Sequence, residues 1–185
     1  MEIIRGVGSD APIVENEKGG KQSKTLYALH LIDPKFLLEF FHTREASEKM
    51  IYYRAVEEIA AYMIYSIQES KPIHLKQAIQ WLSKNVDDTE IMFTIGEVLQ
   101  EGAGRYAPNN WRLIPEEEHI NHALIHILAH IAGDTQDNHI GHAMCRLMMA
   151  YATEKSEGFE YNKFVPKIDE EKCKLEFLDK QYNKE

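Results

Sequence analysis

The stretch from residue 118 to residue 151 holds six of the chain's nine histidines, and it limits the fold more than any other feature. Five of these histidines follow helical spacing, three at intervals of four residues and two at an interval of three: His122, His126, His130, His139 and His142. Residues three or four positions apart lie on one face of an α-helix, about 5–6 Å from each other. We therefore predict two neighbouring helices with histidine-bearing faces, joined by a short acidic loop.

Two acids, Asp134 and Asp137, fall in that loop. An antiparallel pair of helices would bring acids and histidines together, and imidazole nitrogens and carboxylate oxygens are common ligands of transition metals. The candidate metal ligands are His126, Asp137, His139 and His142. The alternative interpretation is that the histidines pack in the core and donate to backbone carbonyls, which we expect above all of His119 and His130.

Composition limits the classes of function. The chain has 185 residues, 44% of them hydrophobic and 28% charged, which is typical of one soluble globular domain. Its net charge of −9 argues against a nucleic acid as partner. We find no apolar run long enough to span a membrane and no secretory signal. Two cysteines do not make a disulfide framework, so we expect a cytoplasmic protein.

Hydrophobic periodicity predicts an all-α fold, a helical bundle of about five to six helices. Ahead of the histidine-rich stretch, helices are expected at residues 34–41, 44–69, 75–84 and 90–101. Asp33 and Thr43 are predicted to cap the first two of these helices. Asp88 or Thr89 would cap the fourth, and Met92 would lie in its buried stripe. No segment alternates convincingly enough to predict a strand.

The same patterns suggest three parts of the chain. Residues 1–25 are polar and rich in glycine and charge, and they are expected to form a flexible N-terminal arm. Residues 26–155 form a single all-α domain. Residues 156–185 are dense in lysine and glutamate, and their apolar residues are too sparse for a second core, so they are expected to be a charged tail.

Two segments outside the histidine-rich stretch carry candidate binding groups. Lys21 follows two glycines whose backbone N–H groups could bind phosphate, although plain flexibility is the alternative. Residues 102–112 contain glycines, a proline and two asparagines, which predicts a loop. Within it Arg105 could bind phosphate, and Asn110 and Trp111 could bind a base or sugar. The alternative for Trp111 is that it fills a gap in the core.

With these motifs in place, the chain shows a resemblance to a known family. The matching segments, in order, are Gly-Gly-Lys at residues 19–21, LHLIDPKFLLE, EVLQEGAGRYAPNNW, HALIHILAHIAGD and HIGHAMCRLMMA. Their order resembles the phage and bacterial dATP/dGTP diphosphohydrolases, the MazZ-type enzymes. The similarity covers roughly residues 19–39 and 95–153, and residues 40–94 look like an insertion between the two parts.

The resemblance implies a MazG-like all-α fold and divalent-metal-dependent cleavage of purine dNTPs to dNMP and pyrophosphate. It matches this chain at Glu97, Gly102, Tyr106, Asn110, Trp111, His126, Gly133, His139 and His142. The chain departs from the family pattern at Arg105, Ile125 and Asp134, where the family has Lys, Arg and Glu. His139 and His142 replace a pair of acids, which favours Mn²⁺, Zn²⁺ or Fe²⁺ over Mg²⁺.

Residues and resemblance together give a hypothesis for the site. The catalytic candidates are Glu97, Glu101 and Asp134, although the two glutamates could equally be solvated surface. The substrate-binding candidates are Lys21, Arg105, Asn110, Trp111 and His122. The expected partners are a nucleotide and further copies of this chain. The alternatives are a protein that binds a nucleotide without cutting it, a different metal-dependent nucleotide phosphohydrolase, and a purely structural helical protein.

Overall fold

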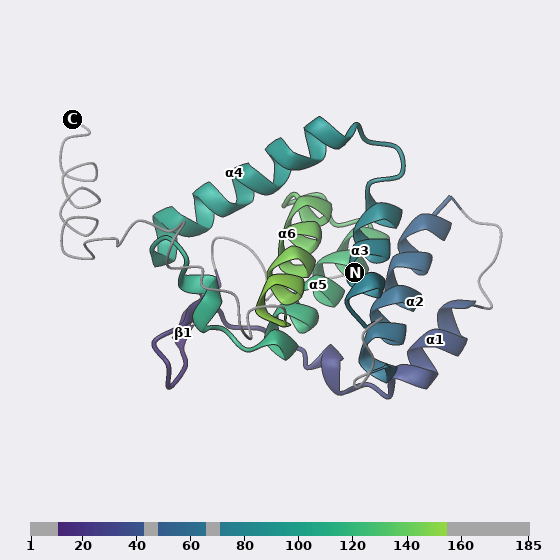
Figure 1. The fold of residues 1–185 in the computed structure, drawn as a ribbon, viewed down its shortest axis with the longest axis horizontal. Helices are drawn as coiled ribbons and strands as arrows, with labels where there is room; N and C mark the ends of the chain where they lie inside the picture. The colour runs from purple at the N-terminus through teal and green to yellow at the C-terminus, as the bar shows by residue number, and fades with distance from the viewer. Residues whose placement is uncertain (1–10, 43–47, 66–70, 155–185) are drawn as a thin grey trace.

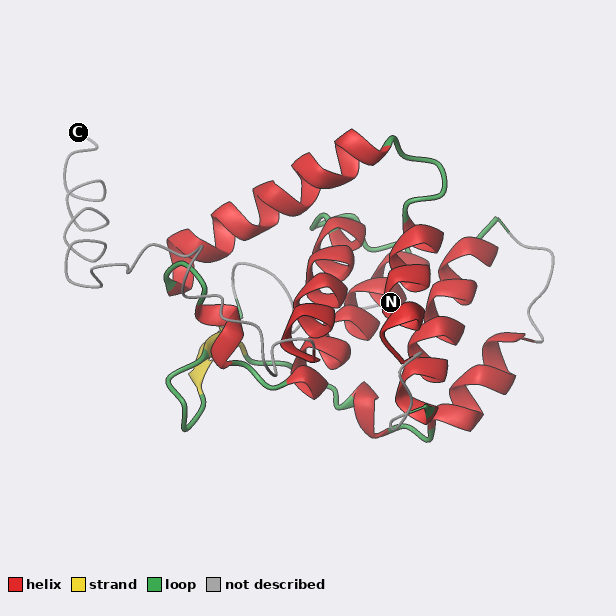
Figure 2. Ribbon diagram, viewed as in Figure 1, coloured by secondary structure: helices red, strands yellow, loops and turns green. Residues whose placement is uncertain are grey.

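The computed structural model describes residues 11–42, 48–65 and 71–154 (Figure 1). Its described part contains α1 (Pro34–His42), α2 (Met50–Ile64), α3 (Lys71–Leu82), α4 (Asp88–Tyr106), α5 (Glu116–Ile131) and α6 (His139–Glu154). Two short 3-10 helices are η1 (Leu29–Leu31) and η2 (Asn110–Leu113), and two short strands are β1 (Ile13–Glu15) and β2 (Lys21–Ser23). The prediction of an all-α fold is confirmed, with one small hairpin added (Figure 2).

Helices α5 and α6 form the centre of the molecule and confirm the predicted helical pair. Between them Gly133 takes a φ of +88°, a conformation that glycine adopts without strain. Asn138 precedes α6, and its Oδ1 accepts a hydrogen bond from the N–H of Gly141 at 3.0 Å. Ile127 of α5 and Leu147 of α6 are fully buried in the same apolar core, so apolar packing helps to hold the two helices together.

Helices α1, α2 and α3 pack together at one side of the α5–α6 pair (Figure 1). The predicted cap of α1 is confirmed, since Asp33 Oδ1 accepts from the N–H of Phe36 at 3.0 Å. The helix predicted at 44–69 is seen from Met50 to Ile64, and Thr43 lies outside the described residues. Lys49, just ahead of α2, donates from its Nζ to the carbonyl of Ile131 at the end of α5.

The tyrosines of α2 are largely used inside this chain. The ring of Tyr52 meets His130 edge-on at 4.5 Å between centroids, and Tyr53 packs on Phe41 at 5.5 Å. Tyr62 is 1% exposed. These contacts lie within one chain, and a homo-oligomer stays a prediction.

Helix α4 differs from its prediction at both ends. Asp87, rather than Asp88 or Thr89, caps it, because Asp87 Oδ1 accepts from the N–H of Thr89 at 2.9 Å. The predicted burial of Met92 is wrong, since this side chain is 64% exposed. The buried face runs instead through Ile91 and Ile95, which are four residues apart.

The loop predicted at residues 102–112 begins later than expected, because α4 continues to Tyr106. Gly102 and Gly104 lie inside the helix, and each costs only about 1 kcal/mol relative to alanine, which the rest of the helix can offset. Near its other end α4 approaches α6 closely. A methyl group on Gly141 of α6 would come within 2.7 Å of Thr94 Cγ2 on α4 and of Asn138 Nδ2, so a larger residue there would displace these side chains.

Residues 11–25 form more structure than the flexible arm predicted for residues 1–25. Strands β1 and β2 pair antiparallel, with Val14 opposite Gln22. The hairpin is held from outside, because the side-chain amide of Asn110 donates to Lys21 O at 2.6 Å and accepts from Lys21 N at 2.8 Å. These bonds join positions 89 residues apart, and a local reading of the sequence does not reveal them. Residues 1–10 and the predicted tail at 156–185 lie outside the described residues.

Within the described ranges, every helix is too short or too polar to cross a lipid bilayer.

Candidate metal centre and adjoining cavity

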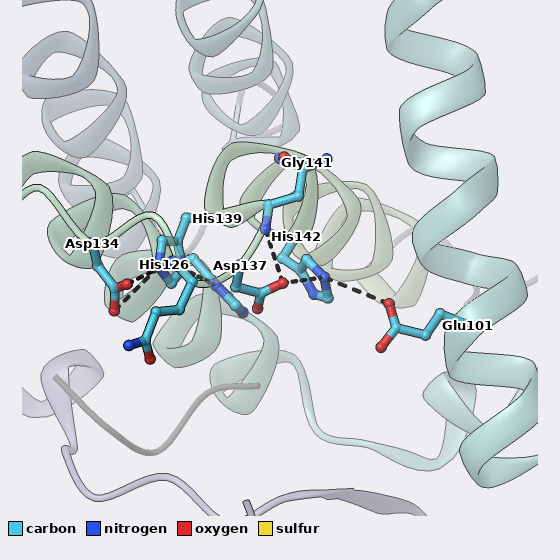
Figure 3. Close-up of polar contacts among 9 residues, drawn as sticks. Glu101, His126, Asp134, Asp137, His139, Gly141 and His142 are labelled. Carbon is cyan, nitrogen blue, oxygen red and sulfur yellow. Dashed lines mark hydrogen bonds and ion pairs between the residues drawn. The ribbon is translucent and has the colours of Figure 1, made fainter. Parts of the chain in front are cut away.

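Two imidazoles meet where α5 and α6 face each other. His126 of α5 and His139 at the start of α6 place their Nδ1 atoms 3.1 Å apart, and both side chains are 3% exposed (Figure 3). The ring of His142, one turn along α6, stacks on His126 at 4.9 Å between centroids. The helical spacing therefore does what the sequence predicted, because it brings the three imidazoles to one place.

Acids from two directions border the imidazoles. Asp137 Oδ1, in the loop before α6, lies 3.3 Å from His142 Nε2, and Asp134 Oδ2 lies 3.4 Å from His139 Nε2. Glu101 approaches from α4, with Oε2 4.0 Å from His142 Nε2 (Figure 3). Candidate ligand atoms of His126, Asp137 and His139 all lie within 4.8 Å of one another. Three helices and a loop thus converge on one cluster of nitrogen and oxygen donors.

Several atoms of the cluster that could bind a metal make no hydrogen bond. Asp137 Oδ1 accepts from the N–H of Asn138 at 2.8 Å, whereas its Oδ2 is buried and has no hydrogen-bond partner. The Nε2 atoms of His122 and His139 are also buried and unpartnered, because the contact of His139 with Asp134 lacks hydrogen-bond geometry. Unsatisfied buried polar atoms are costly, and a bound ligand or cation is one way to satisfy them.

The protonation states favour ligation. Burial, together with the neighbouring His142, lowers the pKa of His126 well below its usual value. Burial and the charge of Arg146 do the same to the pKa of His122. A hydrogen bond with His142 lowers the pKa of Asp137 to about 2, against the opposing effect of burial. Near neutral pH His122 and His126 are therefore neutral and Asp137 is ionised, which are the forms that bind metals.

A cavity of about 500 Å³ opens beside the cluster, within the size range of small-molecule sites. Residues of β2, α4, η2, α5 and α6 line it, and His126, Asp137 and His142 are among them. Of the sequence candidates, it is bordered by Lys21, Glu101, Arg105, Asn110, Trp111, His122, His126, Asp137 and His142. Nine of the twelve predicted site residues thus share one cavity.

The other three candidates lie elsewhere. His139 and Asp134 sit behind the cavity wall, where each contacts the other. Glu97 is exposed on α4 and is not part of the lining, although Glu101, one turn further on, is.

Two of the candidates in the lining already have structural contacts. The amide of Asn110 is occupied by its two hydrogen bonds to the backbone of Lys21. The Trp111 ring is half-buried under the guanidinium of Arg112, which lies 4.2 Å from the ring centroid. The predicted substrate contacts of Asn110 and Trp111 stay predictions.

Comparison with known proteins adds one match. The family model described as dATP/dGTP diphosphohydrolase, N-terminal, matches residues 70–162. The chain belongs to this family. No curated protein and no solved structure matches it.

The match gives the cluster a family context. The diphosphohydrolase region begins just before α3 and includes α4, α5 and α6, so it contains the whole histidine and aspartate cluster. It also contains residues 70–94, which the resemblance described under the sequence analysis assigns to an insertion. The hairpin with Lys21 lies outside the matched range yet borders the same cavity.

Arg146 lines the cavity from α6 and is not among the candidate residues predicted from the sequence. Arg146 is four residues after His142, so both lie on one face of the helix. It is a lone charged residue in the otherwise apolar run from Ala143 to Ala150. A charge within the buried stripe of a helix was the available signal.

Proposed function

We propose that this chain hydrolyses dATP or dGTP to the monophosphate and pyrophosphate, using a divalent cation held by His126, Asp137 and His139. One observation carries the proposal. In the region that matches the dATP/dGTP diphosphohydrolase family, unsatisfied imidazole and carboxylate atoms border a cavity of about 500 Å³. Cationic side chains border the same cavity, which suits a polyphosphate even though the whole chain is acidic.

The donor set fits a transition-metal cation. Two imidazoles and one carboxylate, with ligand atoms within 4.8 Å of one another, resemble the ligand sets of Mn²⁺, Fe²⁺ and Zn²⁺ more than the oxygen-only sets of Mg²⁺. The two facing Nδ1 atoms of His126 and His139 cannot both donate, and a shared cation would satisfy both. When bound, such a cation would neutralise phosphate charge and polarise the attacked phosphoryl group.

The side chains of the chain supply the remaining steps. Lys21 and Arg105 at the cavity border would bind the phosphate chain and turn the α-phosphorus toward the cluster. Glu101, whose Oε2 lies 4.0 Å from His142 Nε2, would accept the proton of the attacking water. The new bond joins the water oxygen to the α-phosphorus, the bond to the bridging oxygen breaks, and pyrophosphate leaves. Asp134, whose Oδ2 lies 3.4 Å from His139 Nε2, would help to orient that ring.

The test is a product analysis. The purified chain is incubated with each of the four dNTPs and with Mn²⁺, Mg²⁺, Zn²⁺ or Fe²⁺, and the products are separated by anion exchange. We expect dAMP or dGMP together with an equal amount of pyrophosphate. Recovery of intact but tightly bound nucleotide would instead support a sequestering protein. Release of orthophosphate would point to a different phosphohydrolase.

A further inference from the structure

Arg146 lines the cavity; burial lowers the pKa of its guanidinium, and the charge of Glu118 opposes that shift without forming an ion pair. Its one side-chain hydrogen bond runs from Nη1 to His119 Nδ1, at 3.1 Å. Among the described residues no carboxylate forms an ion pair with it. The part of its surface that stays exposed borders the cavity. Since a guanidinium has five N–H donors, most of its donor capacity is left for a ligand.

His119 fixes the direction of that guanidinium. Its Nε2 lies 3.0 Å from the carbonyl oxygen of Trp111, which can only accept, so Nε2 carries the hydrogen. Nδ1 is therefore the lone-pair nitrogen that accepts from Arg146. His119 is 0% exposed, and burial lowers its pKa to about 3, so the ring is neutral. The Trp111 carbonyl of η2 thus orients His119, and His119 orients Arg146. Because its ring is neutral, His119 adds no positive charge beside Arg146.

The position of Arg146 relative to the metal-ligand candidates suits a phosphate chain. α5 and α6 run antiparallel, and His126 faces His139 and His142, whereas His119 faces Arg146. Arg146 is four residues beyond His142, which is about 6 Å along the helix axis. A polyphosphate whose one end meets the cluster would reach the guanidinium with its next phosphates.

We propose that Arg146 binds a phosphate group of the nucleotide substrate and that His119 is its positioning residue. This inference rests on the function proposed above, because it assigns the substrate group to the same cavity. An unpaired cation away from bulk water is unfavourable in the empty protein, and an anionic ligand relieves that cost. Arginine also matches two phosphate oxygens at once, which lysine cannot do.

A purely structural role for Arg146 predicts the opposite behaviour. In that case the residue would hold α6 against His119, and its removal would destabilise the fold. If it serves a ligand instead, replacing it by an apolar side chain of similar length leaves the empty protein as stable or makes it more stable. Stability without ligand and the response to an anion therefore separate the two roles.

The experiment measures thermal unfolding with and without inorganic pyrophosphate, in EDTA so that no metal contributes. Wild type is expected to unfold at a higher temperature as pyrophosphate is added. Arg146→Met should unfold no lower than wild type without pyrophosphate and bind it about 10- to 100-fold more weakly. Arg146→Lys should fall between them, because it keeps the charge and loses the planar fork.

Arg54→Met is the matched control, since Arg54 lies on α2 and pairs with Glu57 at 2.6 Å. It should lower the unfolding temperature and leave the response to pyrophosphate unchanged. For His119, substitution by Leu should raise the KM for dATP or dGTP with a smaller change in kcat. His119→Gln, which can both donate and accept, should restore much of the lost affinity.

Two results would overturn the assignment of Arg146. One is an Arg146→Met variant that is less stable yet keeps the wild-type response to pyrophosphate. The other is a wild type that does not respond to pyrophosphate at all. Absence of dNTP turnover, with an Arg146-dependent response to pyrophosphate, would defeat the proposed reaction and leave Arg146 as an anion-binding residue.

Discussion

Two regions of this molecule each contain histidines, acids and an arginine. They differ in whether these polar side chains find partners within the protein. In the α1–α3 region, Glu57 Oε2 lies 2.6 Å from Arg54 Nη1, and Glu58 Oε2 lies 2.8 Å from His74 Nδ1. In the α5–α6 region the acids and bases are in contact, yet buried atoms of His122, Asp137 and His139 have no hydrogen-bond partner.

The difference lies in the balance of partners. Around α2 each glutamate meets a cation or a histidine of its own, so the polar groups there satisfy one another and hold the helices together. Around α6, histidines outnumber the acids that can reach them, and in the described ranges no carboxylate forms an ion pair with Arg146. Polar groups that do not satisfy one another can be satisfied by a ligand, which makes the α5–α6 region the candidate site.

The largest effect should come from breaking the site. Asp137→Asn removes the ionised oxygen of the cluster, and we expect turnover to fall by about 100-fold or more. The folded state should persist, because the Asp137 side chain accepts a backbone hydrogen bond from Asn138 that the amide oxygen of asparagine can also accept. Steady-state release of pyrophosphate, at fixed metal concentration, measures the loss.

Glu58→Gln is the matched control for this substitution, because it makes the same chemical change beside His74 on the other side of the molecule. It should leave turnover within about twofold of wild type, since surface-region changes far from a site alter it little. Equal losses of turnover in both variants would erase the distinction between the two regions.

A substitution in α2 should reverse the pattern. Glu57 is 8% exposed, and Glu57→Gln leaves the guanidinium of Arg54 without its ionised partner. We expect the free energy of unfolding to fall by about 2 to 3 kcal/mol, with turnover per folded molecule unchanged. Urea unfolding followed by circular dichroism gives this value. A loss of turnover at full stability would show that α2 belongs to the site.

Acid should affect the α5–α6 region through its neutral imidazoles. The pKa of His119 is about 3 in the folded state, against about 6.5 when unfolded. The unfolded chain therefore binds the extra proton first, and stability is lost as the pH falls below 6.5. At pH 5 this one residue should cost about 2 kcal/mol relative to pH 7.5.

Urea unfolding of wild type and His119→Gln at the two pH values measures that contribution. The variant should lose about 2 kcal/mol less than wild type on going from pH 7.5 to pH 5. A variant that loses as much as wild type would show that other groups account for the acid sensitivity.

The smallest effect should separate two glutamates on α4. Glu101 borders the cavity near His142, and Glu101→Gln is expected to lower kcat by about tenfold. Glu97→Gln should change kcat by less than about twofold, because Glu97 is exposed outside the cavity lining. The reverse order would favour Glu97, a candidate that the family resemblance matches, as the catalytic carboxylate.

Local patterns in the sequence were enough to predict the helices and the core of the site. The recurrence of histidines at three and four residues depends only on helical geometry, so the pairing of α5 with α6 and the meeting of His126, His139 and His142 could be foreseen. Asp33 at the start of α1 is equally local, because a cap needs only its own turn.

Features that depend on distant contacts could not be foreseen. The hairpin with Lys21 is held by Asn110, far along the chain, and three-residue strands carry little pattern of their own. The exposure of Met92 depends on how α4 is rotated against α6, which its own periodicity leaves open. A role for Arg146 could be inferred only from its contact with His119 and its position at the cavity, and the sequence shows neither.

The position of Gly141 against Thr94 bears on the width of the cavity. The missing methyl group sets the gap between α4 and α6, and both helices line the cavity. Alanine at this position would act as a wedge between the two helices and should widen the cavity without altering any residue that lines it. If the proposed function holds, tolerance for bulkier bases could thus be tuned from a residue that takes no part in the chemistry.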